Sequence, residues 1–125
     1  MTVVDSCGWL EYFKGTPLAE AFAPHIEGPD LGVPTMVIYE VYRVLRRDVS
    51  EEAANEVAAH LRTLQVVPLD EQLALDAADF GLQYRLATAD AVIYATARAL
   101  EATLATSDAH FAGLPGVQYL GASTG

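Results

Sequence analysis

The chain has 125 residues, the size of a single domain, and its hydrophobic fraction of 52% excludes a disordered protein. Its 17 acidic and 7 basic residues give a net charge of −10, a poor balance for a protein that holds nucleic acid by bare electrostatic attraction. The single cysteine, Cys7, excludes an internal disulfide and suits a reducing compartment, and we expect neither a signal peptide nor a membrane span.

The first 34 residues predict a strand followed by two helices. The apolar run 2–5 ends in Asp5 and is typical of a strand. Ser6 is placed to cap the helix that follows, which a glycine closes. A second short helix is expected over residues 18–26. Residues 30–34 fit either a strand fragment or a loop.

Residues 35–84 predict three helices and one strand. Glu40 lies in the second turn of the first helix. Thr35, Ser50 and Asp70 stand at the three helix starts, where a side-chain oxygen can accept a hydrogen bond from an unpaired backbone amide. The helices are expected over residues 36–47, 51–64 and 71–84, and the strand over residues 66–69.

The last third of the chain begins with a helix of small residues. Thr88 can cap this helix, and Asp90 then falls in its first turn, where the helix dipole favours a carboxylate. The short apolar run 102–106 is typical of a buried strand, and Asp108 follows it closely. A turn or short helix is expected over residues 109–114, a last strand over 117–120 and a tail over 121–125.

Apolar strands separated by helices predict an α/β fold with a central, largely parallel sheet flanked by helices. We expect one domain over residues 1–120. In open sheets of this kind, ligands bind beyond the carboxyl ends of the strands. Asp5 and Asp108 are both expected at such ends.

Four acidic residues share an unusual setting. Asp5 and Asp108 end strands, Asp90 opens an alanine-rich helix, and Glu40 lies on the mostly apolar side of its helix. Each carboxylate is expected to be partly buried, and burial of an unpaired carboxylate is costly. The cost disappears if the four converge on a divalent cation.

Oxygen ligands without a nearby set of histidines or cysteines favour Mg²⁺ or Mn²⁺ over zinc. Such an ion polarises a phosphoryl oxygen and generates a hydroxide nucleophile, and a second ion can steady the leaving oxygen. The pattern therefore indicates phosphodiester hydrolysis.

With these residues in place, the sequence resembles the PIN domain and, more narrowly, the ribonuclease toxins of VapBC toxin–antitoxin pairs. The similarity extends over about residues 2–120, and its weight comes from four motifs in order. These are Asp5-Ser6 with Trp9, Glu40 on a helix begun by Pro34-Thr35, Asp90-Ala91 with Ile93 and residues 95–97, and Thr106-Ser107-Asp108 with Phe111.

The resemblance implies a Rossmann-like three-layer PIN fold and Mg²⁺- or Mn²⁺-dependent cleavage of single-stranded RNA, with one or two ions. It also implies a VapB-like antitoxin, a homodimer and a bacterial cytoplasmic setting. By the family pattern the metal ligands and catalytic residues would be Asp5, Glu40, Asp90 and Asp108, supported by Ser6 and Thr106 as polar residues. Cys7 departs from the pattern, since a second hydroxyl residue is common there, and the approach to Asp90 lacks a common proline.

Three arginines at helical spacing, Arg43, Arg46 and Arg47, lie on the helix that carries Glu40. They fit a contact with RNA or with an acidic antitoxin segment, or simply a solvated helix face. The aromatic residues Trp9, Phe13, Tyr39 and Tyr42 fit core packing, a dimer interface or an antitoxin groove.

Taken singly, Asp90 fits a helix-dipole partner, and Asp5 and Asp108 fit turn or capping residues, whereas Glu40 on a mostly apolar face is harder to explain in this way. His25, His60 and His110 are expected at the surface, with a substrate contact open for His110 because it is near Asp108. Cys7 is expected to serve packing.

A phosphorylated receiver domain is one rival interpretation. It needs a lysine after a late strand, and the one lysine here is Lys14. The serious alternative is a catalytically inactive PIN-like binding or regulatory module.

Overall fold

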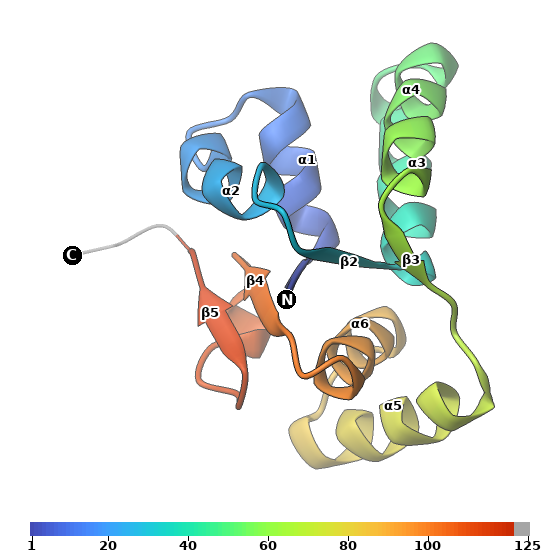
Figure 1. The fold of residues 1–125 in the computed structure, drawn as a ribbon, viewed down its shortest axis with the longest axis vertical. Helices are drawn as coiled ribbons and strands as arrows, with labels where there is room; N and C mark the ends of the chain where they lie inside the picture. Colours follow the sequence, from blue (N-terminus) through green and yellow to red (C-terminus); the bar gives the residue numbers. More distant parts are fainter. Residues whose placement is uncertain (122–125) are drawn as a thin grey trace.

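Five short parallel strands form one sheet at the centre of the structure (Figure 1). The structure is a computed structural model in which residues 1–121 are described. The strand order is β3-β2-β1-β4-β5, so the chain moves to one side from β1 and to the other side for β4 and β5. The strands are β1 Thr2–Val4, β2 Leu31–Pro34, β3 Gln65–Val67, β4 Thr103–Thr106 and β5 Val117–Tyr119.

Within residues 1–121, six α-helices cover the two faces of this sheet, which confirms the predicted three-layer α/β fold. Figure 1 shows α1 to α4 on one side of the sheet and α5 and α6 on the other. Neighbouring helices pack in pairs, α3 on α4 and α5 on α6. The helices are α1 Ser6–Lys14, α2 Ala19–Ile26, α3 Thr35–Asp48, α4 Glu51–Arg62, α5 Glu71–Tyr84 and α6 Thr88–Ala99, with a 3₁₀ turn η1 at Ala109–Phe111.

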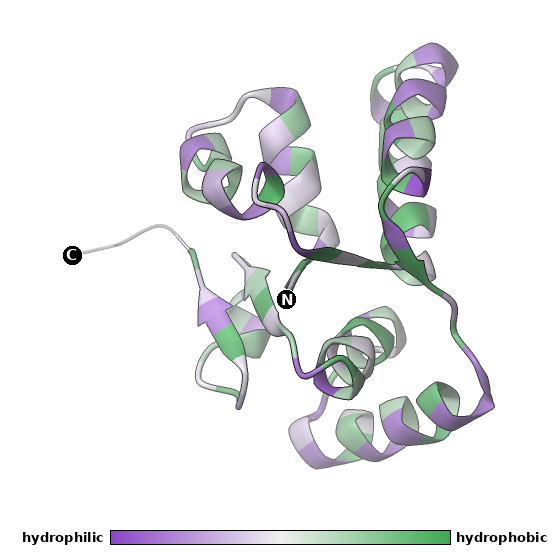
Figure 2. Ribbon diagram, in the orientation of Figure 1, coloured by the Kyte–Doolittle hydropathy of each residue, from purple (hydrophilic) through white to green (hydrophobic). Residues whose placement is uncertain are grey.

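The main core lies between the sheet and its helices. Val3 and Val4 of β1 are fully buried, as are the aromatic rings of Trp9 and Phe22. Gly8 lets α1 approach this core closely, because a Cβ at this position would lie 2.5 Å from Cε1 of Phe22. Figure 2 shows hydrophobic residues along the strands and alternating hydrophobic and hydrophilic residues on the helices, as amphipathic packing requires.

Two predicted helix caps are confirmed. The Ser50 hydroxyl accepts a hydrogen bond from the backbone amide of Ala53 at 3.0 Å, and the Asp70 carboxylate accepts one from the amide of Leu73 at 2.8 Å. Gly15 ends α1 in the left-handed conformation, with φ of 66°, as its position after a basic last turn predicts.

Three predicted caps are wrong by one residue. Ser6, Thr35 and Thr88 are the first helical residues of α1, α3 and α6 instead of their caps. The physical reason is that each preceding residue already has the extended backbone of a cap. These preceding residues are Asp5, Pro34 and Ala87.

Strand boundaries differ from the predicted ones by one or two residues, except in one segment whose type was open. Residues 30–34 contain β2, which pairs with both β1 and β3. The strand expected over residues 66–69 is β3 and ends before Pro68, which has no backbone N–H to donate. The expected tail lies outside the described residues apart from Gly121. No helix in residues 1–121 has the length and apolar character needed to cross a membrane.

Candidate active site

The ends of β1 and β4 place two acidic residues side by side at the point where the strand order reverses. Residues Val4 and Ala105 pair in register, and the backbone amide of Asp5 donates to the Ala105 carbonyl at 3.0 Å. Asp5 therefore sits directly beyond β1, and Asp108 sits two residues beyond β4. This is the edge of an open sheet where ligands bind, so the predicted location is confirmed for these two residues.

The Asp5 carboxylate is buried and held by neighbouring groups. Its side chain is 3% exposed. Its Oδ1 accepts a hydrogen bond from the backbone amide of Ser6 at 2.8 Å, and its Oδ2 accepts one from the Thr106 hydroxyl at 2.7 Å. The Thr106 oxygen in turn accepts from the backbone amide of Asp108 at 3.0 Å. Thr106 thereby links two of the predicted acids.

Two helices bring the other two acids to the same place. Glu40 comes from the second turn of α3, and its Oε1 accepts a hydrogen bond from the Ser6 hydroxyl at 2.9 Å. That hydroxyl is also 3.5 Å from Oδ1 of Asp5, so Ser6 bridges two carboxylates. Asp90 lies in the first turn of α6, half-buried. Hydrogen bonds of Ser6 and Thr106 thus connect Asp5, Glu40 and Asp108. Asp90 lies close enough for the charges of these three acids to raise its pKa.

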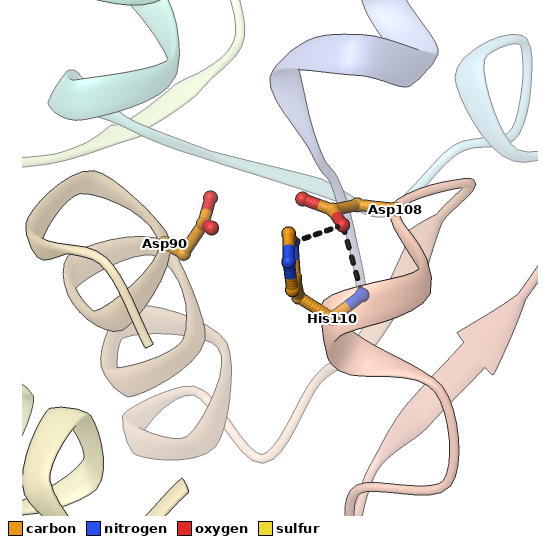
Figure 3. A group of neighbouring side chains, drawn as sticks. All are labelled: Asp90, Asp108 and His110. Atoms are coloured by element: carbon orange, nitrogen blue, oxygen red, sulfur yellow. Dashed lines mark hydrogen bonds and ion pairs between the residues drawn. The ribbon is translucent and has the colours of Figure 1, made fainter. Parts of the chain in front are cut away.

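His110 belongs to this group, which the sequence left open. Its Nδ1 lies 2.9 Å from Oδ1 of Asp108, and its backbone amide donates to the same oxygen at 2.9 Å. One ligand atom each from Asp90, Asp108 and His110 lie within 4.8 Å of one another. Figure 3 shows the imidazole standing between the two carboxylates. The sequence pointed to His110 through its spacing, because it lies two residues after Asp108 in a segment expected to form a turn or short helix.

Cys7 is also at the site, where sequence reasoning expected only packing. Its Sγ lies 3.5 Å from Oδ2 of Asp5 and 3.3 Å from the hydroxyl oxygen of Ser107. Burial, followed by the charge of Asp5, raises the pKa of the Cys7 thiol to about 11. The thiol therefore stays protonated at neutral pH and is a poor nucleophile, which agrees with the expectation that it has no nucleophilic role.

The acids concentrate negative charge in one place. Burial, and then the charges of Asp5, Asp108 and Glu40, raise the pKa of Asp90 to about 6. Burial is also the main cause that raises the pKa values of Asp5 and Glu40. Within residues 1–121, no lysine or arginine forms an ion pair with any of these four acids.

This donor set fits a divalent cation. Carboxylate oxygens from the ends of β1 and β4 and from helices α3 and α6 converge, and no lysine or arginine of residues 1–121 pairs with them. Hard cations such as Mg²⁺ and Mn²⁺ prefer such oxygens. A bound dication would offset the burial and the like-charge repulsion that raise the pKa values of Asp5, Glu40 and Asp90.

The three arginines of α3 differ in their surroundings. Arg46 forms an ion pair with Glu51 at 3.1 Å, and Arg47 forms one with Asp48 at 2.7 Å. Arg43 is exposed and has no ion pair within residues 1–121. Of the three, Arg43 is therefore the one whose charge is available to a partner.

The comparison with protein families identifies the fold. The family model for the PIN domain matches residues 2–117, nearly the whole chain. The chain belongs to the PIN domain family. No curated protein matches the sequence.

Solved structures similar to this PIN domain come from toxin–antitoxin systems. A chain of a toxin–antitoxin complex from Klebsiella pneumoniae has a TM-score of 0.80 at 23% identity, covering 96% of this chain and 98% of its own. VapC20 of Mycobacterium tuberculosis, described as a toxin that cleaves the sarcin–ricin loop, has a TM-score of 0.78 at 18% identity, with 94% and 97% covered. A chain of DNA-bound VapBC from Salmonella typhimurium has a TM-score of 0.76 at 14% identity, with 95% and 97% covered. These similarities confirm the PIN-like fold.

Proposed function

We propose that this PIN domain, residues 1–120, is a Mg²⁺- or Mn²⁺-dependent endoribonuclease that hydrolyses single-stranded RNA. We further propose that it acts as the toxin of a VapBC-type pair and is inhibited by a cognate VapB-like antitoxin. The observation that carries the proposal is the convergence of Asp5, Glu40, Asp90 and Asp108 at one sheet edge, with no lysine or arginine of residues 1–121 paired to them.

The four acids would hold the divalent ion, and the supporting residues fix their orientation. Thr106 donates to Asp5, and Ser6 donates to Glu40, so both carboxylates are held in place before any ligand arrives. The ion, when bound, supplies Lewis-acid chemistry at a phosphoryl oxygen and lowers the pKa of water. Asp90 and Asp108 are half-buried whereas Asp5 is buried, so a phosphodiester could reach the site from the side of these two acids.

The partners are proposed by similarity and by surface character. The Klebsiella and Salmonella chains belong to toxin–antitoxin complexes, which supports an antitoxin for this chain. Leu75 and Leu82 are exposed and lie about two turns apart on α5, where they offer an apolar contact to a protein partner, including a second copy of the chain. A bacterial cytoplasmic setting is proposed on the same similarity.

Cleavage of a mixed single-stranded RNA pool tests the proposal. We expect the wild type to cleave RNA in Mn²⁺ and not in EDTA. Asp5→Asn and Asp90→Asn each remove a carboxylate charge at little change in volume. We expect either substitution to lower the rate by about 10³-fold or more, which is ~4 kcal/mol.

Asp79→Asn is the matched control, because Asp79 is an exposed acid on α5 outside the site. It should cleave like the wild type. Full activity of Asp90→Asn would contradict the proposed assignment. A folded, antitoxin-free wild type that neither binds Mn²⁺ nor cleaves RNA would favour the inactive binding module.

A further inference from the structure

The position of His110 is not explained by packing. Its side chain is 78% exposed, so it contributes little to the core. The backbone fixes it nevertheless, because η1 begins immediately after Asp108 and the His110 amide is bonded to the Asp108 carboxylate. This turn holds the imidazole against Asp108 and directs it towards α6, where Asp90 lies (Figure 3).

The distance between His110 and Asp108 suits a hydrogen bond in the metal-free site and also suits two ligands of one metal ion. Two ligands at right angles in an octahedral site with bonds of about 2.1 Å are about 3.0 Å apart, and two opposite ligands are about 4.2 Å apart. Nδ1 of His110 is 2.9 Å from Oδ1 of Asp108, and an oxygen of Asp90 lies within 4.8 Å of both, so a small side-chain movement would bring all three onto one ion. A neutral imidazole with its proton on Nε2 has a lone pair on Nδ1 available for such a bond.

We propose that His110 supplies a nitrogen ligand to the divalent ion shared by Asp90 and Asp108, and that this nitrogen makes the site prefer Mn²⁺ to Mg²⁺. The inference rests on the proposed function, since it concerns the ion that the four acids would hold. Imidazole nitrogen is a softer donor than carboxylate oxygen and suits first-row transition ions, whereas Mg²⁺ takes oxygen ligands and keeps several waters.

Pulsed electron paramagnetic resonance of bound Mn²⁺ tests this directly, because a coordinated nitrogen produces a characteristic coupling. We expect the coupling in the wild type and its loss in His110→Gln. The same substitution should weaken Mn²⁺ binding about tenfold or more. Mg²⁺ binding, measured by competition with Mn²⁺, should change much less.

Control variants separate the possible outcomes. His25→Gln alters a histidine on α2 outside the site and should keep the nitrogen coupling. Mn²⁺ that binds in an Asp90-dependent manner without nitrogen coupling would overturn the role of His110 and leave the proposed nuclease site intact. Equal weakening of Mn²⁺ and Mg²⁺ in His110→Gln would also overturn the proposed preference. Absence of any Mn²⁺ binding by the wild type would contradict both the inference and the proposed function.

Discussion

At the scale of single residues, Asp90 shows how burial and like charge act together. Its carboxylate is half-buried and faces three other carboxylates, so its pKa rises to about 6. Without a bound cation, ionisation of Asp90 therefore costs more in the folded chain than in the unfolded chain. The folded state holds the Asp90 proton between about pH 4 and pH 6, and the unfolded state releases it.

A pH-dependent loss of stability follows for the metal-free protein. The contribution of Asp90 to the free energy of unfolding is fully present below about pH 4 and is lost as the pH rises through about 6. In EDTA, we expect Asp90→Asn to melt a few degrees above the wild type at pH 7 and the difference to shrink towards pH 4. Thermal unfolding at a series of pH values measures this. A melting temperature of Asp90→Asn below that of the wild type at pH 7 would contradict it.

Thr106 is the residue on which the geometry of two acids depends. Thr106→Val removes the donor to Asp5 and the acceptor for the Asp108 amide. We expect a loss of about 1–3 kcal/mol in the free energy of unfolding, measured with urea, because buried polar groups lose their partners. Mn²⁺ affinity should fall about 10- to 100-fold. Thr106→Ser keeps the hydroxyl and should lose far less of both.

The residues of the site differ in how far the sequence could predict them. Asp5 and Asp108 follow apolar strands, and that pattern places them at one sheet edge. The hydrogen bonds of Ser6 and Thr106 agree with their predicted supporting positions, whereas the metal-binding role of the acids stays a prediction. The nearness of His110 to Asp108 in the sequence left a substrate contact open, but the direction of its ring could not be predicted, because that depends on the short 3₁₀ turn η1 that turns the ring back towards α6.

At the scale of the elements, the exact start of a helix and the identity of a short strand were the features that the sequence predicted least well. Ser50 and Asp70 follow loops and cap their helices, as predicted. Thr35 and Thr88 do not, because the extended backbone of the preceding residue makes that residue the cap. β2 has four residues, all buried, and such a short run has no alternation that distinguishes a strand from a loop.

Helix α3 carries both Glu40 of the site and Arg43, which forms no ion pair within residues 1–121. Arg43 lies about one helical turn after Glu40, so we expect it near a phosphate of an RNA strand that enters the site. We expect Arg43→Ala to weaken RNA binding and to lower the slope of log K against log salt by about one. The binding titration is made in the Asp90→Asn background, which prevents cleavage.

Arg47→Ala is the comparison for Arg43, because the Arg47 guanidinium is already paired with Asp48. Its effect on RNA binding should be clearly smaller. Equal effects of the two substitutions would show that the charge of the helix face matters and not Arg43 in particular. An unchanged affinity in Arg43→Ala, with weaker antitoxin binding, would assign Arg43 to the antitoxin.

At the scale of the whole molecule, the topology explains why an acidic protein can be a nuclease. The strand order reverses between β1 and β4, and helices from both faces of the sheet add Glu40 and Asp90 at that edge. A net charge of −10 gives no general attraction for RNA. Binding of a phosphodiester at this edge would therefore depend on a cation held between the acids and the substrate.

The melting temperature with and without Mn²⁺ tests this account most directly. Mn²⁺ at about 100 times its Kd stabilises the folded state by about 2.7 kcal/mol. For a domain of this size, that is a rise of roughly 10 °C. We predict this rise for the wild type and for Asp79→Asn, and little or none for Asp90→Asn. An unchanged melting temperature of the wild type in saturating Mn²⁺, or the same rise in Asp90→Asn, would contradict a cation site built from these four acids.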